Sequence, residues 1–179
     1  MKTPEFGVRF AGFGGQGILT AGYLLGLAAT IYAGKNALQT QSYGPESRGG
    51  ASLCDVTISD EPIRRLKIKT LDTLVVMSQE AYDKYRKLIK TDGRIIYDKS
   101  LVRIEEEDRP KAVGVPATKI AIELGSRMMA NVVMLGALFG ATKLIDAEAL
   151  KTAIKNQFPR HAEANLKAFE EGIKQVERH

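Results

Sequence analysis

The residues best suited to chemistry in this sequence form a glycine-rich turn near its start, Gly12-Phe13-Gly14-Gly15-Gln16-Gly17. The turn follows one apolar run, 6–11, and precedes another, 18–33, which predicts a strand, a turn and a helix. Glycine lets a ligand or a neighbouring backbone approach closely, and a helix N-terminus offers unpaired N–H groups to an anion. The turn is therefore a candidate site for a phosphate or another anion; the alternative is that its glycines serve close packing alone.

A dinucleotide site is the usual interpretation of the pattern GxGxxG, which Gly12, Gly14 and Gly17 form here. Such a site also needs an Asp or Glu about 20 residues later, at the end of the second strand, to bind the ribose hydroxyls. The stretch at that distance, 36–41, reads Asn-Ala-Leu-Gln-Thr-Gln and contains no acid. We therefore expect no NAD at this turn.

A second loop, 43–50, reads Tyr-Gly-Pro-Glu-Ser-Arg-Gly-Gly and carries two charges. In a parallel sheet it follows the second strand and lies beside the glycine turn, at the carboxyl edge where open α/β sheets bind ligands. We expect the two loops to form one anion-accepting edge. The candidate binding residues are Gly12, Gly14, Gly15, Gln16 and Gly17 in the turn, and Tyr43, Gly44, Glu46, Arg48 and Gly49 in the loop.

Two charged stretches have simpler interpretations. The basic stretch 64–69 suits an acidic protein or a phosphate, but its alternation favours a charged edge strand over 63–69. The acidic run 105–108 lacks metal-ligand spacing and is typical of a solvated loop. Neither stretch defines a site by itself.

The chain has one cysteine, Cys54, and two histidines, His161 and His179. Cys54 lies in an apolar strand, where a cysteine is usually a small buried hydrophobe. These numbers exclude an iron–sulfur cluster held by this chain's own thiolates, a zinc ribbon and a nucleophile–histidine pair placed by motif. We therefore expect no catalysis by this chain alone and no metal bound to it.

The composition limits the class of protein. The chain has 179 residues, 44% hydrophobic and 26% charged, with a formal net charge of +5, which suits a single domain over 1–179. Its basic residues are dispersed and accompany no nucleic-acid motif, so we expect no nucleic acid as partner. The start does not resemble a signal peptide, and the longest apolar run, 128–141, is interrupted by Asn131 and too short to span a bilayer. We expect a cytoplasmic protein with no membrane contact.

Apolar runs alternate with amphipathic stretches, which predicts a doubly wound, mainly parallel α/β sheet of the Rossmann-like type. The expected strands are 6–11, 36–42, 51–58, 63–69, 74–77, 94–97 and 113–115. The expected helices are 18–33, with Gly34 as its C-cap, 79–89, 116–125, 131–144, one that begins at Asp146, and a final one around 162–176. From Pro116 onward the pattern predicts a helical C-terminal part.

Three segments resemble a known family: GFGGQGILTAG (12–22), QSYGPESRGGASLCDVTISDEPI (41–63), and PATKIAIELG with NVVMLGALFGAT (within 116–142). They are similar to the gamma subunit of 2-oxoacid:ferredoxin oxidoreductases, which also occurs as a fused domain of pyruvate:ferredoxin oxidoreductases. Because the chain stops at His179, we expect a separate subunit. The form SYGPESRGG, in place of FGPERRGA, resembles the 2-oxoglutarate or branched-chain class more than the pyruvate class.

The resemblance implies an assembly in which this chain is a non-catalytic gamma subunit. Its partners would be alpha and beta subunits and a ferredoxin-like delta subunit, which hold thiamine diphosphate, magnesium and the iron–sulfur clusters. Related complexes form acyl-coenzyme A, so the anion at the glycine turn would be a phosphate of coenzyme A or a carboxylate of a partner. Alternatives are the small subunit of an indolepyruvate- or pyruvate-type oxidoreductase and, in another class, a free-standing nucleotide-binding module.

The first and last helices present more apolar area than one face of a sheet needs. Tyr23, Leu24 and Leu27 contribute on the first helix, and a stripe that includes Leu166 and Ile173 on the last. We expect part of this area to be a subunit interface, to the alpha and beta partners or to a second copy when the chain is isolated.

Overall fold

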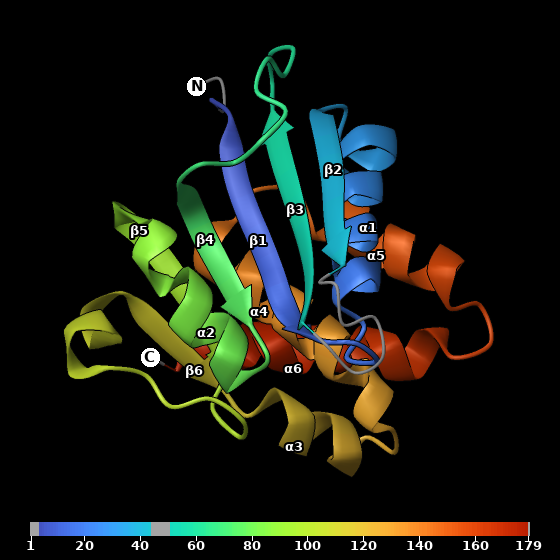
Figure 1. Cartoon of the computed structure of the whole chain (residues 1–179). Coiled ribbons are helices and arrows are strands. Elements are labelled where there is room, and N and C mark those ends of the chain that lie inside the picture. Colours follow the sequence, from blue (N-terminus) through green and yellow to red (C-terminus); the bar gives the residue numbers. More distant parts are fainter. Residues whose placement is uncertain (1–3, 44–50, 179) are drawn as a thin grey trace.

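The structure is a computed structural model that describes residues 4–43 and 51–178. Within these ranges, helices cover a six-stranded sheet of order β2-β3-β1-β4-β5-β6 (Figure 1). The strands are β1 (Phe6–Phe13), β2 (Asn36–Tyr43), β3 (Ala51–Ser59), β4 (Leu71–Val76), β5 (Ile89–Asp98) and β6 (Ala112–Val115). The α/β fold class is confirmed.

The sheet is parallel on one side of β1 and antiparallel on the other. Strands β1, β4, β5 and β6 pair in parallel, whereas β3 pairs antiparallel with both β1 and β2. Because β3 returns in the opposite direction, β2 runs the same way as β1. The carboxyl ends of β1 and β2 therefore share one edge of the sheet, as predicted.

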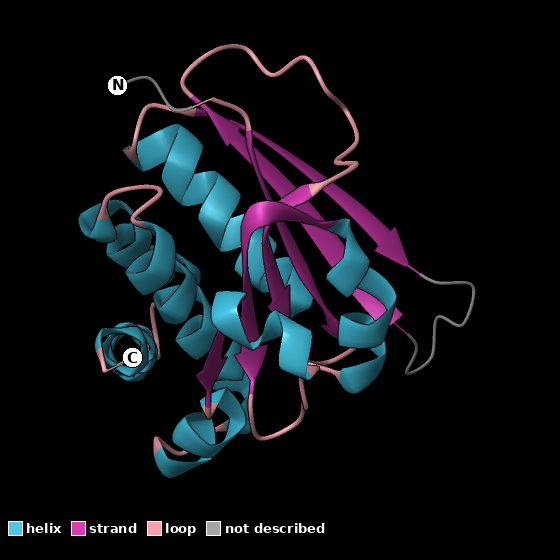
Figure 2. Ribbon diagram, turned by 90° about the vertical axis from the view of Figure 1, so that its left-hand side faces the viewer, coloured by secondary structure: helices cyan, strands magenta, loops and turns pink. Residues whose placement is uncertain are grey.

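Helices lie on both faces of the sheet, as Figures 1 and 2 show. A large apolar core joins one face to α1, α4, α5 and α6 and includes Phe10, Leu24, Met134 and Phe169. A smaller core on the other face includes Leu74, Ile95 and Tyr82 of α2. The helices are α1 (Ile18–Leu27), α2 (Gln79–Tyr85), α3 (Ala117–Glu123), α4 (Ala130–Thr142), α5 (Ala147–Gln157) and α6 (Ala162–Glu177). The predicted helical C-terminal part is present.

The predicted edge strand 63–69 is wrong. This segment belongs to a long irregular connection from β3 to β4, which Figure 2 shows arching away from the sheet. The reason is topological: β3 and β4 lie on opposite sides of β1, so the chain must cross β1 to join them. A crossing segment cannot pair along an edge.

Two helices end earlier than predicted. The α-helical part of the first ends at Leu27 and continues as a π-helical turn, Ala28–Tyr32. Gly34 follows with a φ of 64°, which confirms its predicted place after the helix. The second ends at Tyr85 and continues as a 3-10 turn, Arg86–Leu88, so that β5 begins five residues earlier than expected.

The expected interface on α1 is only partly available. Leu24 is fully buried in the core, whereas Tyr23 is 46% exposed. Among the described residues, no helix combines the length and the apolar character needed to cross a membrane.

Candidate functional site at the carboxyl edge of the sheet

The glycine turn lies at the switch point of the sheet. From β1 the chain turns through α1 to β2 on one side, while β4 adjoins β1 on the other side. Open α/β sheets bind ligands in the crevice outside the carboxyl ends of strands at such a point. The structure therefore places the turn where a ligand site of this fold is expected.

The side chain of Gln16 spans the gap between β1 and the residue after β4. Its Oε1 accepts a hydrogen bond from the N–H of Phe13 at 2.7 Å, and its Nε2 donates to the carbonyl of Met77 at 2.8 Å. A Cβ on Gly12, which is the penultimate residue of β1, would lie 2.3 Å from Gln16 Oε1. Gln16 thus ties the turn to β4, and Gly12 leaves room for it.

Gly17 begins α1 in a left-handed conformation, with a φ of 74°. A Cβ there would lie 2.4 Å from Nδ2 of Asn131, which donates a hydrogen bond to the carbonyl of Gly17 at 3.2 Å. Asn131 is 4% exposed near the start of α4. Sequence reasoning missed this contact, although a single polar residue in the apolar run 128–141 was a visible indication of it.

Gly14 and Gly15 are the exposed part of the turn. Gly15 has a φ of 89°, and a Cβ on it would meet nothing within 4 Å. In residues 4–43 and 51–178, the N–H groups of Gly14 and Gly15 donate no hydrogen bond. Because they lie just before the N-terminus of α1, these two N–H groups are the ones that suit an anion.

The structure describes the two ends of the second loop but not the loop itself. Gly44, Glu46, Arg48 and Gly49 lie outside the described residues, as does the side chain of Tyr43. In the sheet, however, the backbone of Tyr43 pairs with Ser52, which pairs with Gly12. Both ends of the loop therefore adjoin the glycine turn, which confirms the predicted proximity for the ends alone.

A buried carboxylate organises the same edge beyond β4. Asp98, the last residue of β5, is fully buried. Its Oδ2 accepts hydrogen bonds from the N–H of Thr118 at 2.9 Å and from Thr118 Oγ1 at 2.5 Å. Asp98 thereby caps the first turn of α3, a contact between residues 20 positions apart that sequence patterns did not reveal.

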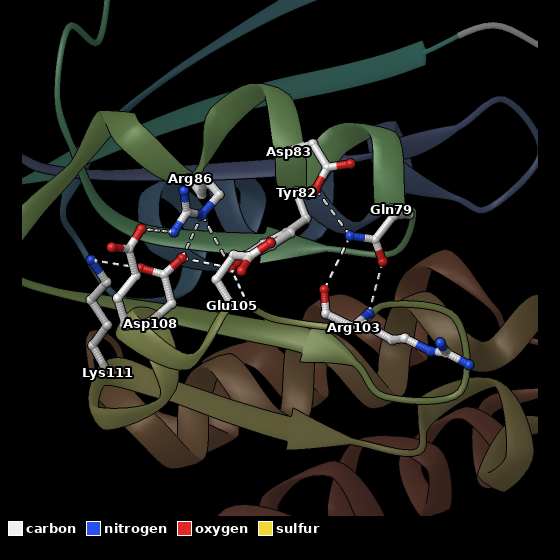
Figure 3. Close-up of polar contacts among 9 residues, drawn as sticks. Gln79, Tyr82, Asp83, Arg86, Arg103, Glu105, Asp108 and Lys111 are labelled. Carbon is white, nitrogen blue, oxygen red and sulfur yellow. Dashed lines mark hydrogen bonds and ion pairs between the residues drawn. The ribbon is translucent and has the colours of Figure 1, made fainter.

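A polar network holds the connection after β5 against α2 (Figure 3). Asp108, 3% exposed, accepts hydrogen bonds at Oδ2 from Tyr82 Oη at 2.6 Å and from Arg86 Nε at 2.7 Å. Lys111 Nζ lies 3.0 Å from the other carboxylate oxygen, and Arg86 also pairs with Glu107. Glu105, Glu106 and Glu107 are exposed, as predicted for a solvated segment, whereas Asp108 is buried and tethers this connection to α2.

The charge of Asp108 makes this tether sensitive to pH. Burial alone would raise the pKa of its carboxyl, but the hydrogen bonds from Tyr82 and Arg86 and the charge of Lys111 outweigh burial and hold the pKa below its ordinary value. A carboxyl whose pKa is lower in the folded state adds stability above its unfolded pKa, and that stability is lost as the pH falls through the folded pKa.

We therefore expect Asp108→Asn to lower the free energy of unfolding by about 2 kcal/mol at pH 7, because two charged partners lose their carboxylate. The difference from wild type should shrink below about pH 4, where the carboxyl of the unfolded chain becomes protonated, and vanish as the pH falls through the lower pKa of the folded carboxyl. Urea denaturation at several pH values measures it, with the exposed Asp83→Asn as control. The usual pKa of an Asp carboxyl lies about one unit above pH 3 and more than one unit below pH 7. A difference in the free energy of unfolding that is constant between pH 3 and pH 7 would contradict the role of this charge.

The surroundings of Cys54 keep its thiol protonated and therefore unreactive. Cys54 is fully buried against α1, and a Cβ on Gly22 would lie 2.2 Å from its sulfur. Burial raises the pKa of the thiol to about 11, in spite of a hydrogen bond from Gln39. This confirms the prediction of a buried hydrophobe. Among the described residues, no group of three or more His, Cys, Asp or Glu side chains could hold a metal ion.

These features define a Rossmann-like α/β protein with a glycine turn at its switch point. Comparison with known proteins makes the class specific. Residues 7–175 match the pyruvate ferredoxin/flavodoxin oxidoreductase family, and the chain belongs to that family. This confirms the predicted resemblance and makes the chain part of an oxidoreductase.

Relatives cover nearly the whole chain. The 2-oxoglutarate synthase subunit KorC of Methanocaldococcus jannaschii is 47% identical over 169 residues, which are 92% of this chain and 90% of the relative. The pyruvate synthase subunit PorC of Methanothermobacter thermautotrophicus is 34% identical over 92% of this chain and 94% of the relative. The crystal structure of a keto/oxoacid ferredoxin oxidoreductase gamma subunit from Geobacter sulfurreducens superimposes with a TM-score of 0.88 at 36% identity, and covers 98% of both chains. The chain is thus similar to gamma subunits along its length.

Proposed function

We propose that this chain is the gamma subunit of a 2-oxoglutarate:ferredoxin oxidoreductase. The reaction converts 2-oxoglutarate, coenzyme A and oxidised ferredoxin into succinyl-coenzyme A, carbon dioxide and reduced ferredoxin. The observation that carries this choice is the identity of 47% to a 2-oxoglutarate synthase subunit, against 34% to a pyruvate synthase subunit. The loop sequence SYGPESRGG agrees with it.

Two alternatives have less support. A pyruvate- or indolepyruvate-type small subunit shares the domain and differs in its partners. A free-standing nucleotide-binding module needs an acid for the ribose, which 36–41 lacks. In addition, Gln16 already uses the N–H of Phe13 in the turn.

In the proposed complex, alpha, beta and ferredoxin-like delta subunits hold thiamine diphosphate, magnesium and the iron–sulfur clusters, in the cytoplasm. Thiamine diphosphate supplies the electron sink for decarboxylation. This chain contributes binding and orientation at the carboxyl edge of its sheet. Gly14 and Gly15 present two N–H groups, and Arg48 adds a guanidinium, to a phosphate of coenzyme A or to a carboxylate of a partner subunit.

The function is tested on the complex purified with the chain from its own cell. We expect oxidation of 2-oxoglutarate that depends on coenzyme A and reduces ferredoxin, with a higher kcat/KM than for pyruvate or indolepyruvate. The isolated chain should reduce no acceptor. A complex that prefers pyruvate or indolepyruvate would replace the proposed substrate, and activity of the chain alone would overturn its role as a non-catalytic subunit.

The same complex tests the anion-accepting edge through a matched pair of variants. Gly14 is exposed and is not among the glycines with positive φ, so its backbone accepts an L-residue. Gly14→Asp adds a negative charge beside the two N–H groups, and Gly14→Asn adds the same volume without it. If the anion is a phosphate of coenzyme A, Asp should raise KM for coenzyme A about tenfold above Asn, the loss expected for one charge-assisted contact. If it is a partner's carboxylate, Asp should weaken assembly. Equal behaviour of the two variants in both measurements excludes an anion at this turn.

A further inference from the structure

A second concave site lies at the opposite edge of the sheet from the glycine turn. Residues 65–70 of the connection between β3 and β4 line a half-open cavity of about 610 Å³ against the sheet. The floor of the cavity is Gly7 at the start of β1 and Thr57 near the end of β3, and its roof is 65–70. This volume is within the usual range of small-molecule sites.

The roof is held to the sheet by close packing. A Cβ on Gly7 would lie 3.1 Å from Cδ1 of Ile68, so the glycine allows Ile68 to approach the strand. The N–H of Arg64 donates a hydrogen bond to Glu5 Oε1 at 2.9 Å. The cavity is therefore a built feature of the fold.

The two carboxylates that line the cavity are already neutralised. Asp72 accepts a hydrogen bond from the N–H of Gly7 at 2.7 Å and pairs with Lys90 Nζ at 2.6 Å. Glu5 accepts from the N–H of Arg64 and lies 3.8 Å from Arg65 Nε. Neither carboxylate is left to attract a cation.

Two ammonium groups remain uncommitted. Lys67 and Lys69 line the cavity, are exposed, and form no ion pair with any residue in 4–43 or 51–178. Arg65 lies at the rim with its side chain 85% exposed, and its charge is offset by Glu5. The cavity thus has an excess of positive charge and attracts anions.

Apolar surface accompanies this charge. Leu66, which is 72% exposed, and Ile68, which packs on Gly7, both line the cavity. Inorganic phosphate alone would leave this surface unused. A nucleotide combines a polyanion with a flat apolar ring system and suits both parts of the lining.

We propose that the cavity beneath 65–70 binds a nucleotide of the adenosine diphosphate type, with its phosphates at Lys67 and Lys69 and its base against Leu66. The volume of the cavity and its floor at Thr57, which is 6% exposed, favour a small ligand over an acidic protein surface. The site is independent of the proposed oxidoreductase function and lies at the other end of β1 from the candidate anion edge.

The test is calorimetric titration of the full chain with ADP, adenosine and inorganic phosphate. We expect ADP to bind more tightly than either of the other two, and more weakly as salt increases. In Lys67→Gln/Lys69→Gln, Kd for ADP should rise about tenfold or more. The control Lys119→Gln/Lys155→Gln makes the same change of net charge on exposed helix positions and should leave Kd unchanged.

A further variant separates this site from the glycine turn. Gly14→Asp should leave Kd for ADP unchanged, whereas Leu66→Ala should weaken ADP and not inorganic phosphate. The proposal is overturned if ADP does not bind, if both double-lysine variants weaken it equally, or if Gly14→Asp abolishes binding that Lys67→Gln/Lys69→Gln retains. If ADP does not bind and the Lys67→Gln/Lys69→Gln chain also fails to assemble with its partner subunits, the segment is instead a contact for an acidic protein surface.

Discussion

Replacing Gly136 with alanine is expected to lower the free energy of unfolding by about 3 kcal/mol, because α4 and α6 cross with their backbones in contact. A Cβ at 136 would lie 2.0 Å from the carbonyl oxygen of Phe169, and a Cβ at Gly172 would lie 2.0 Å from the carbonyl oxygen of Val133. Both obstacles are backbone atoms, so no side-chain rotation relieves them. The two helices must therefore move apart, and Phe169, which is fully buried, loses packing contacts as they do.

The matched control is Gly26→Ala, one residue before α1 ends at Leu27 and the helix continues as the π-helical turn. A Cβ there would meet nothing within 4 Å, so the substitution adds helix propensity without a clash. It should raise stability by about 0.5–1 kcal/mol. Urea denaturation of the two variants measures the difference, and equal effects would show that the helices do not cross as closely as the structure has them.

The glycines of α4 show how far sequence reasoning reaches. Gly136 and Gly140 lie in an otherwise apolar stretch of sequence, a pattern that favours a close helix contact. The sequence did not identify the partner, because Gly172 lies in a helix whose pattern is that of an ordinary amphipathic surface helix. Spacing within a helix shows that a close approach is possible, but only the fold shows which backbone is there.

The candidate site divides in the same way. The position of the glycine turn followed from local pattern, since strand, glycines and helix are consecutive in the chain. The hydrogen bond from Gln16 to Met77 joins residues 61 positions apart, and that from Asn131 to Gly17 joins residues 114 apart. Such contacts depend on which strands and helices become neighbours, and sequence periodicity does not contain that information.

The predicted edge strand over 63–69 is wrong because an alternation of apolar and charged residues has two possible causes. Alternating apolar and charged residues are typical of an edge strand. They also occur where a connection lays alternate side chains against a sheet, as Ile68 does against Gly7. The order of the strands, which places β3 and β4 on opposite sides of β1 and so takes the chain across β1, decides between the two causes.

Replacing Asp55 with alanine is expected to lower the free energy of unfolding by about 4 kcal/mol, because it leaves a buried guanidinium without its counter-charge. Arg9 and Asp55 lie directly opposite on β1 and β3. Their two hydrogen bonds, Nε to Oδ1 and a terminal nitrogen to Oδ2, measure 2.6 and 2.7 Å, and both side chains are 10% exposed. Burial lowers the pKa of Arg9, but its hydrogen bond and charge interaction with Asp55 outweigh burial and raise it, so the guanidinium stays charged.

The double variant Arg9→Leu/Asp55→Leu decides what the pair contributes. Replacing both charges by leucine removes the cost of desolvating them and leaves no unpaired charge, although leucine is larger than the aspartate it replaces. We expect the double variant to be within about 1 kcal/mol of wild type, although Arg9 loses its stacking at 4.7 Å over the ring of Tyr85. Urea denaturation of wild type, Arg9→Leu, Asp55→Leu and the double variant gives the coupling energy. If the double variant is as unstable as Asp55→Ala, the pair stabilises the sheet in itself. If the double variant is as stable as expected, the instability of Asp55→Ala arises from the unpaired buried charge of Arg9. The ion pair then specifies the pairing of β1 with β3 and contributes little to the free energy of unfolding.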